Sequence, residues 1–79
     1  MLTGDIPIGK LLQLYVDTSK VREYVTGISK KKKDGHVIMT EIAKSPGPID
    51  YSHYKNSEKT PSGQPVIINL SYIKRFEIL

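Results

Sequence analysis

The segment 65–79, PVIINLSYIKRFEIL, restricts the fold more than any other part of the chain. It contains two short apolar runs, at 66–68 and 73–79, and both are too short for a helix and rich in β-branched residues, so we expect two strands. No Gly or Asn-Gly lies between them, which predicts a tight helical bend rather than a two-residue hairpin. Strands joined in this way belong to one strongly curved sheet, and a sheet that curls into a small barrel hides its edges.

Three further strands are expected upstream, at 10–17, 21–29 and 36–43, and the final two at 65–69 and 73–79. Asp34-Gly35 is a strong hairpin signal, and we expect it to form one turn together with Lys30, Lys31, Lys32 and Lys33. Gly27 interrupts the second strand and is the predicted bend point, because glycine inside a strand marks a bulge or a close backbone approach. The fold class is therefore all-β: a small barrel of five bent antiparallel strands, with one N-terminal helical turn capped by Asp5.

Residues 44–64 contain Pro, Gly, Ser, Lys and Asn and almost no aliphatic side chain. This pattern predicts a long loop between the third and fourth strands, and such loops are usually functional or disordered. With 79 residues, the whole chain 1–79 is expected to be a single domain. Its last residue falls inside an expected strand, as it would in a piece trimmed from a longer protein.

The composition narrows the possible partners. The chain has no Cys, no apolar run near the ~20 residues that a membrane span needs, and no signal-peptide pattern at its start, so we expect a soluble intracellular domain without a membrane partner. The formal net charge of +4 favours an acidic partner, nucleic acid above all. A solvated face is the alternative interpretation, since four of the 12 basic residues lie in the run at 30–33.

The order of these elements resembles the Sm and Sm-like (Lsm) family. The residues that carry the resemblance are Val25-Thr26-Gly27-Ile28, Asp34 and Val37-Ile38-Met39 in the first half, and the strand–bend–strand at 67–79 in the second. The resemblance implies a short N-terminal helix, five bent antiparallel strands, and a variable loop between the third and fourth strands. It also implies subunits that pair through the edges of the fourth and fifth strands.

Two positions depart from the members of that family that thread uridine-rich RNA. Those proteins use an Asp-x-Met-Asn turn and an Arg-Gly pair, whereas this chain has Val37 in place of the Asn, and Asn69-Leu70 or Leu70-Ser71 in place of Arg-Gly. Valine has no group that bonds a base, so we expect the uridine pocket to be absent. The chain is more similar to divergent Lsm domains, which implies an adaptor in cytoplasmic mRNA translation and decay, with nuclear location as the alternative and an ataxin-2-like protein as partner.

Three sets of residues are candidate contact sites. Lys30 to Lys33 together with His36 are predicted to contact RNA or an acidic partner through charge. In the loop, Tyr51, His53, Tyr54 and Lys55 are predicted to anchor a protein partner or to stack on bases. The alternative is a mobile loop whose tyrosines fold back over the barrel or stay loose. Val66, Ile68, Phe76 and Ile78 are predicted to form an edge-strand interface that supports a homo- or hetero-oligomer; for Phe76, Ile78 and Leu79 the alternative is the barrel core.

The residues that could take part in catalysis form no pattern typical of an enzyme. No acid–base pair, Ser-His-Asp order or phosphate loop stands out, and His36 and His53 lack the carboxylate spacing of a metal site, so we expect no catalytic residue, metal or cofactor. Two other functions remain open. One is a direct single-stranded RNA-binding subunit of a ring complex in RNA processing or splicing, and the other is a chromo- or Tudor-like reader with an aromatic cage.

Overall fold

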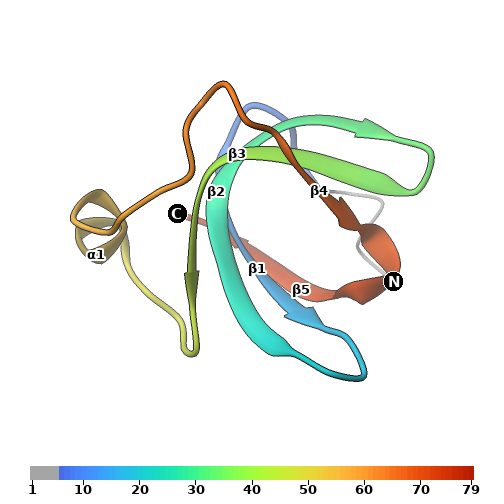
Figure 1. The fold of residues 1–79 in the computed structure, drawn as a ribbon, viewed down its shortest axis with the longest axis horizontal. Coiled ribbons are helices and arrows are strands. Elements are labelled where there is room, and N and C mark those ends of the chain that lie inside the picture. Colours follow the sequence, from blue (N-terminus) through green and yellow to red (C-terminus); the bar gives the residue numbers. More distant parts are fainter. Residues whose placement is uncertain (1–5) are drawn as a thin grey trace.

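The computed structural model describes residues 6–79. Its elements, in chain order, are β1 (Leu11–Asp17), β2 (Arg22–Lys33), β3 (His36–Ser45), α1 (Tyr51–Lys55), β4 (Val66–Asn69), the 3₁₀ turn η2 (Leu70–Tyr72) and β5 (Ile73–Ile78). The strands form one antiparallel sheet in the order β4-β3-β2-β1-β5, and its curvature wraps it into a small barrel (Figure 1). The predicted all-β class with five bent antiparallel strands is confirmed. No helix among the described residues is long and apolar enough to cross a membrane.

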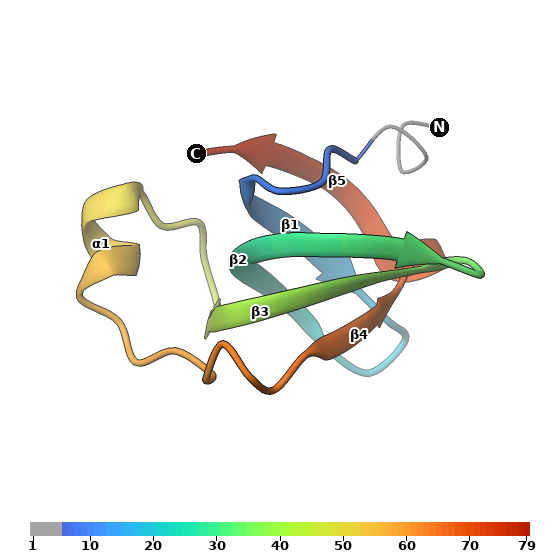
Figure 2. The same cartoon turned by 90° about the horizontal axis from the view of Figure 1, so that it is seen from above.

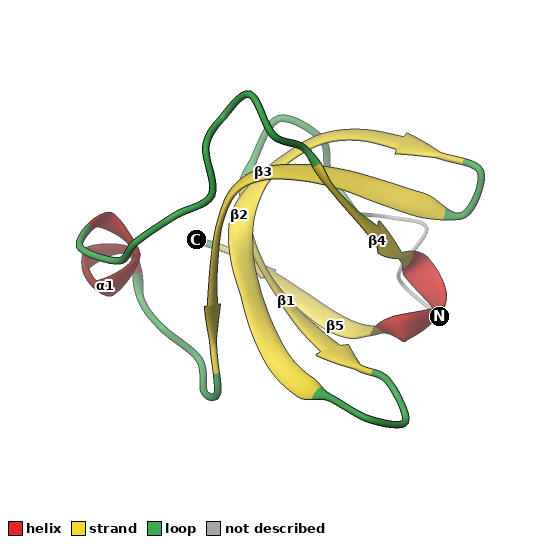
Figure 3. Ribbon diagram, viewed as in Figure 1, coloured by secondary structure: helices red, strands yellow, loops and turns green. Residues whose placement is uncertain are grey.

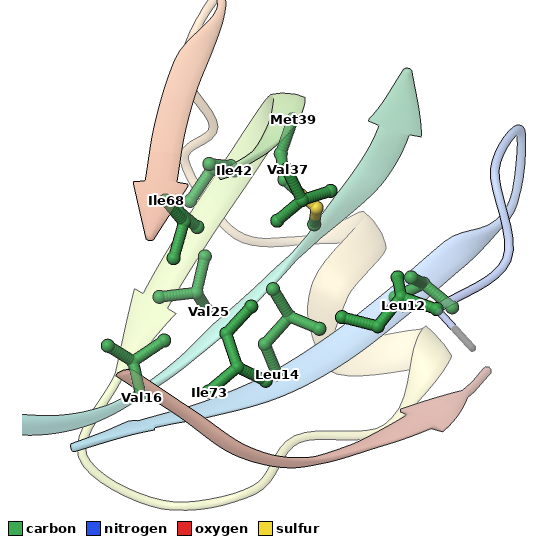
Figure 4. Packing of buried hydrophobic residues seen from close by; sticks show 10 residues of the cluster. Leu12, Leu14, Val16, Val25, Val37, Met39, Ile42, Ile68 and Ile73 are labelled. Carbon is green, nitrogen blue, oxygen red and sulfur yellow. The ribbon is translucent and has the colours of Figure 1, made fainter. Parts of the chain in front are cut away.

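The core is built from apolar side chains that alternate along the strands. Leu12, Leu14 and Val16 of β1 point inward, as their alternation predicted, and Figure 4 shows them meeting side chains from the other strands. Gln13 lies between them and is buried on the opposite face of the sheet. Its amide donates hydrogen bonds to the Thr26 hydroxyl at 3.2 Å and to the Ile49 carbonyl at 2.6 Å, so its burial leaves no polar group unpaired.

Gly27 lies at an irregularity of the β2–β3 pairing, as expected of a glycine inside a strand. The register passes from Thr26 opposite Ala43 to Ile28 opposite Thr40, so Gly27 faces two residues of β3 and the pair forms a β-bulge. A Cβ at Gly27 would lie 2.8 Å from the carbonyl oxygen of Thr40, which explains why only glycine fits.

The β2–β3 hairpin is tighter than predicted. Asp34 and Gly35 form a two-residue turn with φ angles of 51° and 77°. The expectation that Lys30 to Lys33 belong to the turn is wrong, because these lysines continue β2 up to Lys33. A two-residue turn with positive φ at both positions matches the twist of the strands and needs no further loop residues.

The segment between β3 and β4 contains a short helix that was not predicted. Lys44 and Ser45 still belong to β3, and α1 lies within the expected loop (Figure 3). Asp50 caps this helix, since its carboxylate accepts a hydrogen bond of 2.8 Å from the His53 amide. Further along, the Thr60 amide donates to the Ile42 carbonyl at 3.0 Å, and the Thr60 hydroxyl accepts from the Ile42 amide at 2.8 Å. The loop is thus tied to the bulge in β3.

The structure agrees with the prediction at the C-terminal end of the described chain and differs from it at the N-terminal end. The predicted helical bend between the last two strands is confirmed as η2, in which the Asn69 side chain accepts from the Ser71 amide at 2.9 Å. Asp5, the predicted N-terminal cap, lies outside the described residues. From 6 to 10 the chain shows no helical turn. Instead Ile6 is buried in the core and the Gly9 amide donates to the Ser29 carbonyl at 2.7 Å.

Candidate functional site

The outer edge of β4 carries main-chain groups that no strand within residues 6–79 pairs. The Leu70 amide donates to the Gly35 carbonyl at 2.9 Å, which makes these two residues a hydrogen-bonded pair of the β3–β4 ladder. Because such pairs alternate in an antiparallel ladder, Ile68 and Val66 also bond to β3, and the main chain of Ile67 and the amide of Asn69 face outward. The Asn69 carbonyl begins η2. We call this outward main chain the β4 edge. The Ile67 side chain is 63% exposed beside it.

The outer edge of β5 is open in the same way. The Leu79 amide donates to the Leu11 carbonyl at 3.0 Å, so the alternation turns the main chain of Phe76 and Ile78 away from β1. Ile78 is exposed, whereas Phe76 is half-buried against the core. Figure 2 shows β4 and β5 diverging from η2 along opposite sides of the sheet.

These positions refine the predicted edge-strand residues. Phe76 and Ile78 lie on the β5 edge. Val66 and Ile68 bond to β3 through their main chains, and Ile68 is buried in the core, so the outward positions of β4 are Ile67 and Asn69. Sequence reasoning missed Ile67 because three β-branched residues in succession fit either phase of a strand. The alternative expectation that Ile78 and Leu79 fill the core is wrong, since both are exposed.

A pocket of about 350 Å³ opens beside the β4 edge. We call it the seam pocket. Its lining combines apolar side chains with a polar rim and consists of Val16, Glu23, Val25, His36, Lys44, Val66, Ile67, Ile68, Asn69 and Tyr72. Across the rim, the Lys44 ammonium lies 3.6 Å from a carboxylate oxygen of Glu23. This is the composition of a site that takes an apolar group and recognises polar atoms around it.

The lysine hairpin, residues 30–36, stands next to this pocket. Its four lysines are exposed, and Lys33 pairs across the hairpin with His36, which in turn pairs with Asn69 of β4. The His36 ring nitrogen Nδ1 lies 2.9 Å from the Asp34 carbonyl oxygen, and His36 also lines the pocket. The structure therefore brings the predicted charge site, Lys30 to Lys33 with His36, beside the β4 edge.

The predicted loop residues separate into two groups. Tyr51, His53 and Lys55 are exposed on α1, and the Lys55 ammonium lies 5.2 Å from the centre of the Tyr51 ring. Tyr54 is buried, and its hydroxyl donates to the Glu41 carbonyl at 2.6 Å, so it anchors the helix to the barrel. Burial raises the pKa of Tyr54 above its usual value of 10.0, and the charges of Glu41 and Tyr51 add to the rise. As a surface contact for a partner, Tyr54 was wrongly predicted.

A row of side chains on the outer face of the sheet was not predicted. The rings of Tyr15 and Tyr24 pack with centroids 5.0 Å apart, and the Arg75 guanidinium lies 4.4 Å from the centre of the Tyr15 ring. Arg75 also donates to the Tyr24 hydroxyl at 2.9 Å. The three residues come from β1, β2 and β5, so no local signal in the sequence could have joined them.

Acidic and histidine side chains are dispersed over the rest of the surface. Among residues 6–79, no three of them gather where they could hold a metal ion. Comparison with known proteins identifies no family for this chain, because no protein-family model, no curated protein and no solved structure matches it. The β4 edge, with its pocket and its neighbouring lysines, is therefore the site on which a function can be argued.

Proposed function

We propose that this domain is an Sm-like adaptor in cytoplasmic mRNA metabolism, where it joins ribonucleoproteins of translation and decay by binding partner proteins. One observation carries the proposal: the sheet ends in two open edges, since β4 pairs only with β3 and β5 only with β1 among the described strands. Unpaired edges are templates for the addition of another strand.

The chemistry of such binding is main-chain pairing. A partner strand beside β4 exchanges hydrogen bonds with the amide and carbonyl of Ile67 and accepts from the amide of Asn69, whose carbonyl already begins η2. A partner strand beside β5 exchanges hydrogen bonds at Phe76 and Ile78. Main-chain bonds supply affinity without a particular side chain, so the Val37 and Asn69 positions that depart from RNA-threading proteins do not weaken it. The exposed side chains of Ile67 and Ile78 then decide which partner fits.

The cellular context rests on the sequence resemblance. An Sm-like chain is implied to have five bent strands, a variable segment between the third and fourth, and a strand–bend–strand ending, and the described residues have these three. This agreement supports the proposal at the level of architecture. The short N-terminal helix that the resemblance also implies is not formed by residues 6–10. Small barrels host many functions, so the ribonucleoprotein setting and an ataxin-2-like partner come from the resemblance and need a direct test.

The test compares wild type with Ile67→Pro and Ile67→Thr in capture from cell lysate followed by quantitative mass spectrometry. Proline removes the outward-facing amide of Ile67 without removing a bond to β3, whereas threonine keeps that amide and serves as the control. We expect ribonucleoprotein components to be enriched by the wild type and the threonine variant and lost with the proline variant. A domain that neither self-associates nor captures any ribonucleoprotein component would contradict the proposal.

The second candidate is direct binding of single-stranded RNA, which the lysine hairpin favours. Its four lysines are exposed on a hairpin that projects beyond the barrel (Figure 1). Fluorescence anisotropy with a uridine-rich RNA at low and at physiological salt separates the two functions. Binding that persists at physiological salt supports the RNA-binding subunit. Binding at low salt alone, with a slope of roughly four phosphate contacts, identifies the lysines as a non-specific contact.

A further inference from the structure

The seam pocket gives an incoming strand a place for one apolar side chain. Its inner wall contains Val16 and Val25, which are 8% and 2% exposed and belong to the core. The adjoining wall is β4 itself, including Ile67 and Asn69, whose main chain faces outward. A strand that pairs with these residues lies along the pocket, so a side chain directed from it toward the barrel is removed from water against valine and isoleucine.

The charges beside the pocket restrict the partner further. Cross-strand partners share a face, and two rows run from the lysine hairpin to the β4 edge: Lys31–Ile38–Ile67 and Lys33–His36–Asn69. Lys31 and Lys33 are exposed, and the hairpin carries one carboxylate, that of Asp34. A segment paired with β4 lies three strand spacings, about 14 Å, from the main chain of these lysines, so they act on its charge through their positive field and not by contact. That field favours Asp or Glu in the segment.

The chain's own β5 does not meet this requirement. In β5, Arg75 and Glu77 lie on the face opposite the core, so a second copy would bring one cation and one anion on that face and no net negative charge. The formal net charge of +4 adds repulsion between two copies. Charge thus favours a different, acidic chain at β4 over self-pairing.

We infer that the β4 edge binds an extended acidic peptide, which adds a strand to β4, inserts an apolar side chain into the seam pocket and places its carboxylates in the positive field of the lysine hairpin. This inference rests on the proposed edge-strand function and names the chemistry of its partner. Affinity comes from the Ile67 and Asn69 main chain and from the buried anchor. The lysines select acidic segments and speed their association.

The experiment is a selection of random peptides displayed on phage against the wild-type domain, followed by anisotropy with the selected peptides after labelling. We expect the selected peptides to have apolar residues at alternate positions and Asp or Glu at one end. Ile67→Pro should abolish their binding and Ile67→Thr should retain it. In amide NMR spectra, the peptides should shift the signals of Ile67, Asn69 and Tyr72.

A charge-matched pair of variants tests the acidic part of the inference. Lys31→Glu with Lys33→Glu should weaken binding of the selected peptides roughly tenfold, from two exposed charge reversals near the bound segment. Lys20→Glu with Lys55→Glu makes the same change in net charge at exposed sites outside the pocket lining and should leave the affinity unchanged. Equal losses in both double variants would overturn the inference, because the effect would then follow net charge alone.

Failure of the inference is separable from failure of the proposed function. Neutral or basic selected peptides, or a preference for a peptide of residues 73–79, would overturn the acidic partner, while loss of binding in Ile67→Pro would still support edge pairing. Peptides that bind Ile67→Pro as well as wild type, or no selected peptide at all, would overturn the inference outright. Uridine-rich RNA that shifts Ile67 and Asn69 while no peptide does would also overturn it and assign the edge to RNA.

Discussion

The hydroxyl of Tyr54 in α1 donates a 2.6 Å hydrogen bond to the carbonyl oxygen of Glu41 in β3. Glu41 has a φ of 53°, which a glutamate rarely adopts, and it lies in the bulge opposite Gly27. The bond links the loop helix to the place where the barrel bends. Together with the two bonds between Thr60 and Ile42, it holds the carbonyls of the bulge in a fixed arrangement.

Tyr54→Phe should lower the free energy of unfolding by about 1–2 kcal/mol, because it leaves the Glu41 carbonyl without its donor while the buried ring remains. Urea denaturation followed by circular dichroism measures the change. Tyr51→Phe is the matched control, since Tyr51 is exposed and its hydroxyl makes no hydrogen bond within residues 6–79. Equal effects of the two substitutions would show that the bond to Glu41 contributes nothing specific.

The raised pKa of Tyr54 predicts a loss of stability at alkaline pH. The folded state holds this proton more tightly than the unfolded state, whose tyrosine titrates near 10.0. The corresponding stabilisation is complete below that pH and disappears as the pH rises through the higher folded-state value. Denaturation midpoints measured on either side of pH 10 should therefore fall more in the wild type than in Tyr54→Phe. Parallel curves for the two proteins would show that Tyr54 titrates normally.

Gly27→Ala should destabilise the barrel by about 1–3 kcal/mol, the range for overpacking a tight site. The added Cβ would lie 2.8 Å from the Thr40 carbonyl oxygen and 3.0 Å from Cγ1 of Ile42, and the first of these is backbone that cannot turn away. Gly47→Ala is the control, because nothing lies within 4 Å of its added Cβ. Thermal unfolding of both variants measures the difference. If Gly27→Ala were as stable as Gly47→Ala, the bulge could open without loss of stability.

Asp50→Ala should destabilise α1, since the carboxylate that caps the helix accepts from the His53 amide at 2.8 Å. The expected loss is about 1 kcal/mol for an N-cap substitution. Hydrogen exchange at the Tyr54 amide, which bonds the Asp50 carbonyl at 2.9 Å, should become faster. Ser52→Ala alters a neighbouring exposed residue and should leave that exchange rate unchanged, so acceleration in both variants would contradict a capping role.

Local sequence signals determined the strands and their turns. Asp34-Gly35 specifies a two-residue turn because both positions need positive φ, and Gly27 specifies the bend because the opposite strand approaches where a Cβ would be. The β-branched run before Asn69 and the run after Tyr72 specify two strands with a helical bend between them. Each of these features depends on backbone sterics within a few residues, which a sequence displays directly.

The loop helix and the outer face depended on contacts that a sequence does not display. A helix as short as α1 is marginal alone, and it forms here because Tyr54 is buried against β3, far from it along the chain. Arg75 reaches Tyr15 and Tyr24 only because β5 and β2 lie on either side of β1.

In the candidate site too, some features follow from local sequence and others only from tertiary contacts. Sequence alone placed an edge interface on the last two strands and a basic site at Lys30 to Lys33 with His36. The phase of β4 was decided by the pairing of Leu70 with Gly35, which turns Ile67 outward and Ile68 into the core. A run of β-branched residues suits either face of a strand, so only the tertiary ladder, which satisfies the main-chain bonds to β3, selects the residues that a partner can meet.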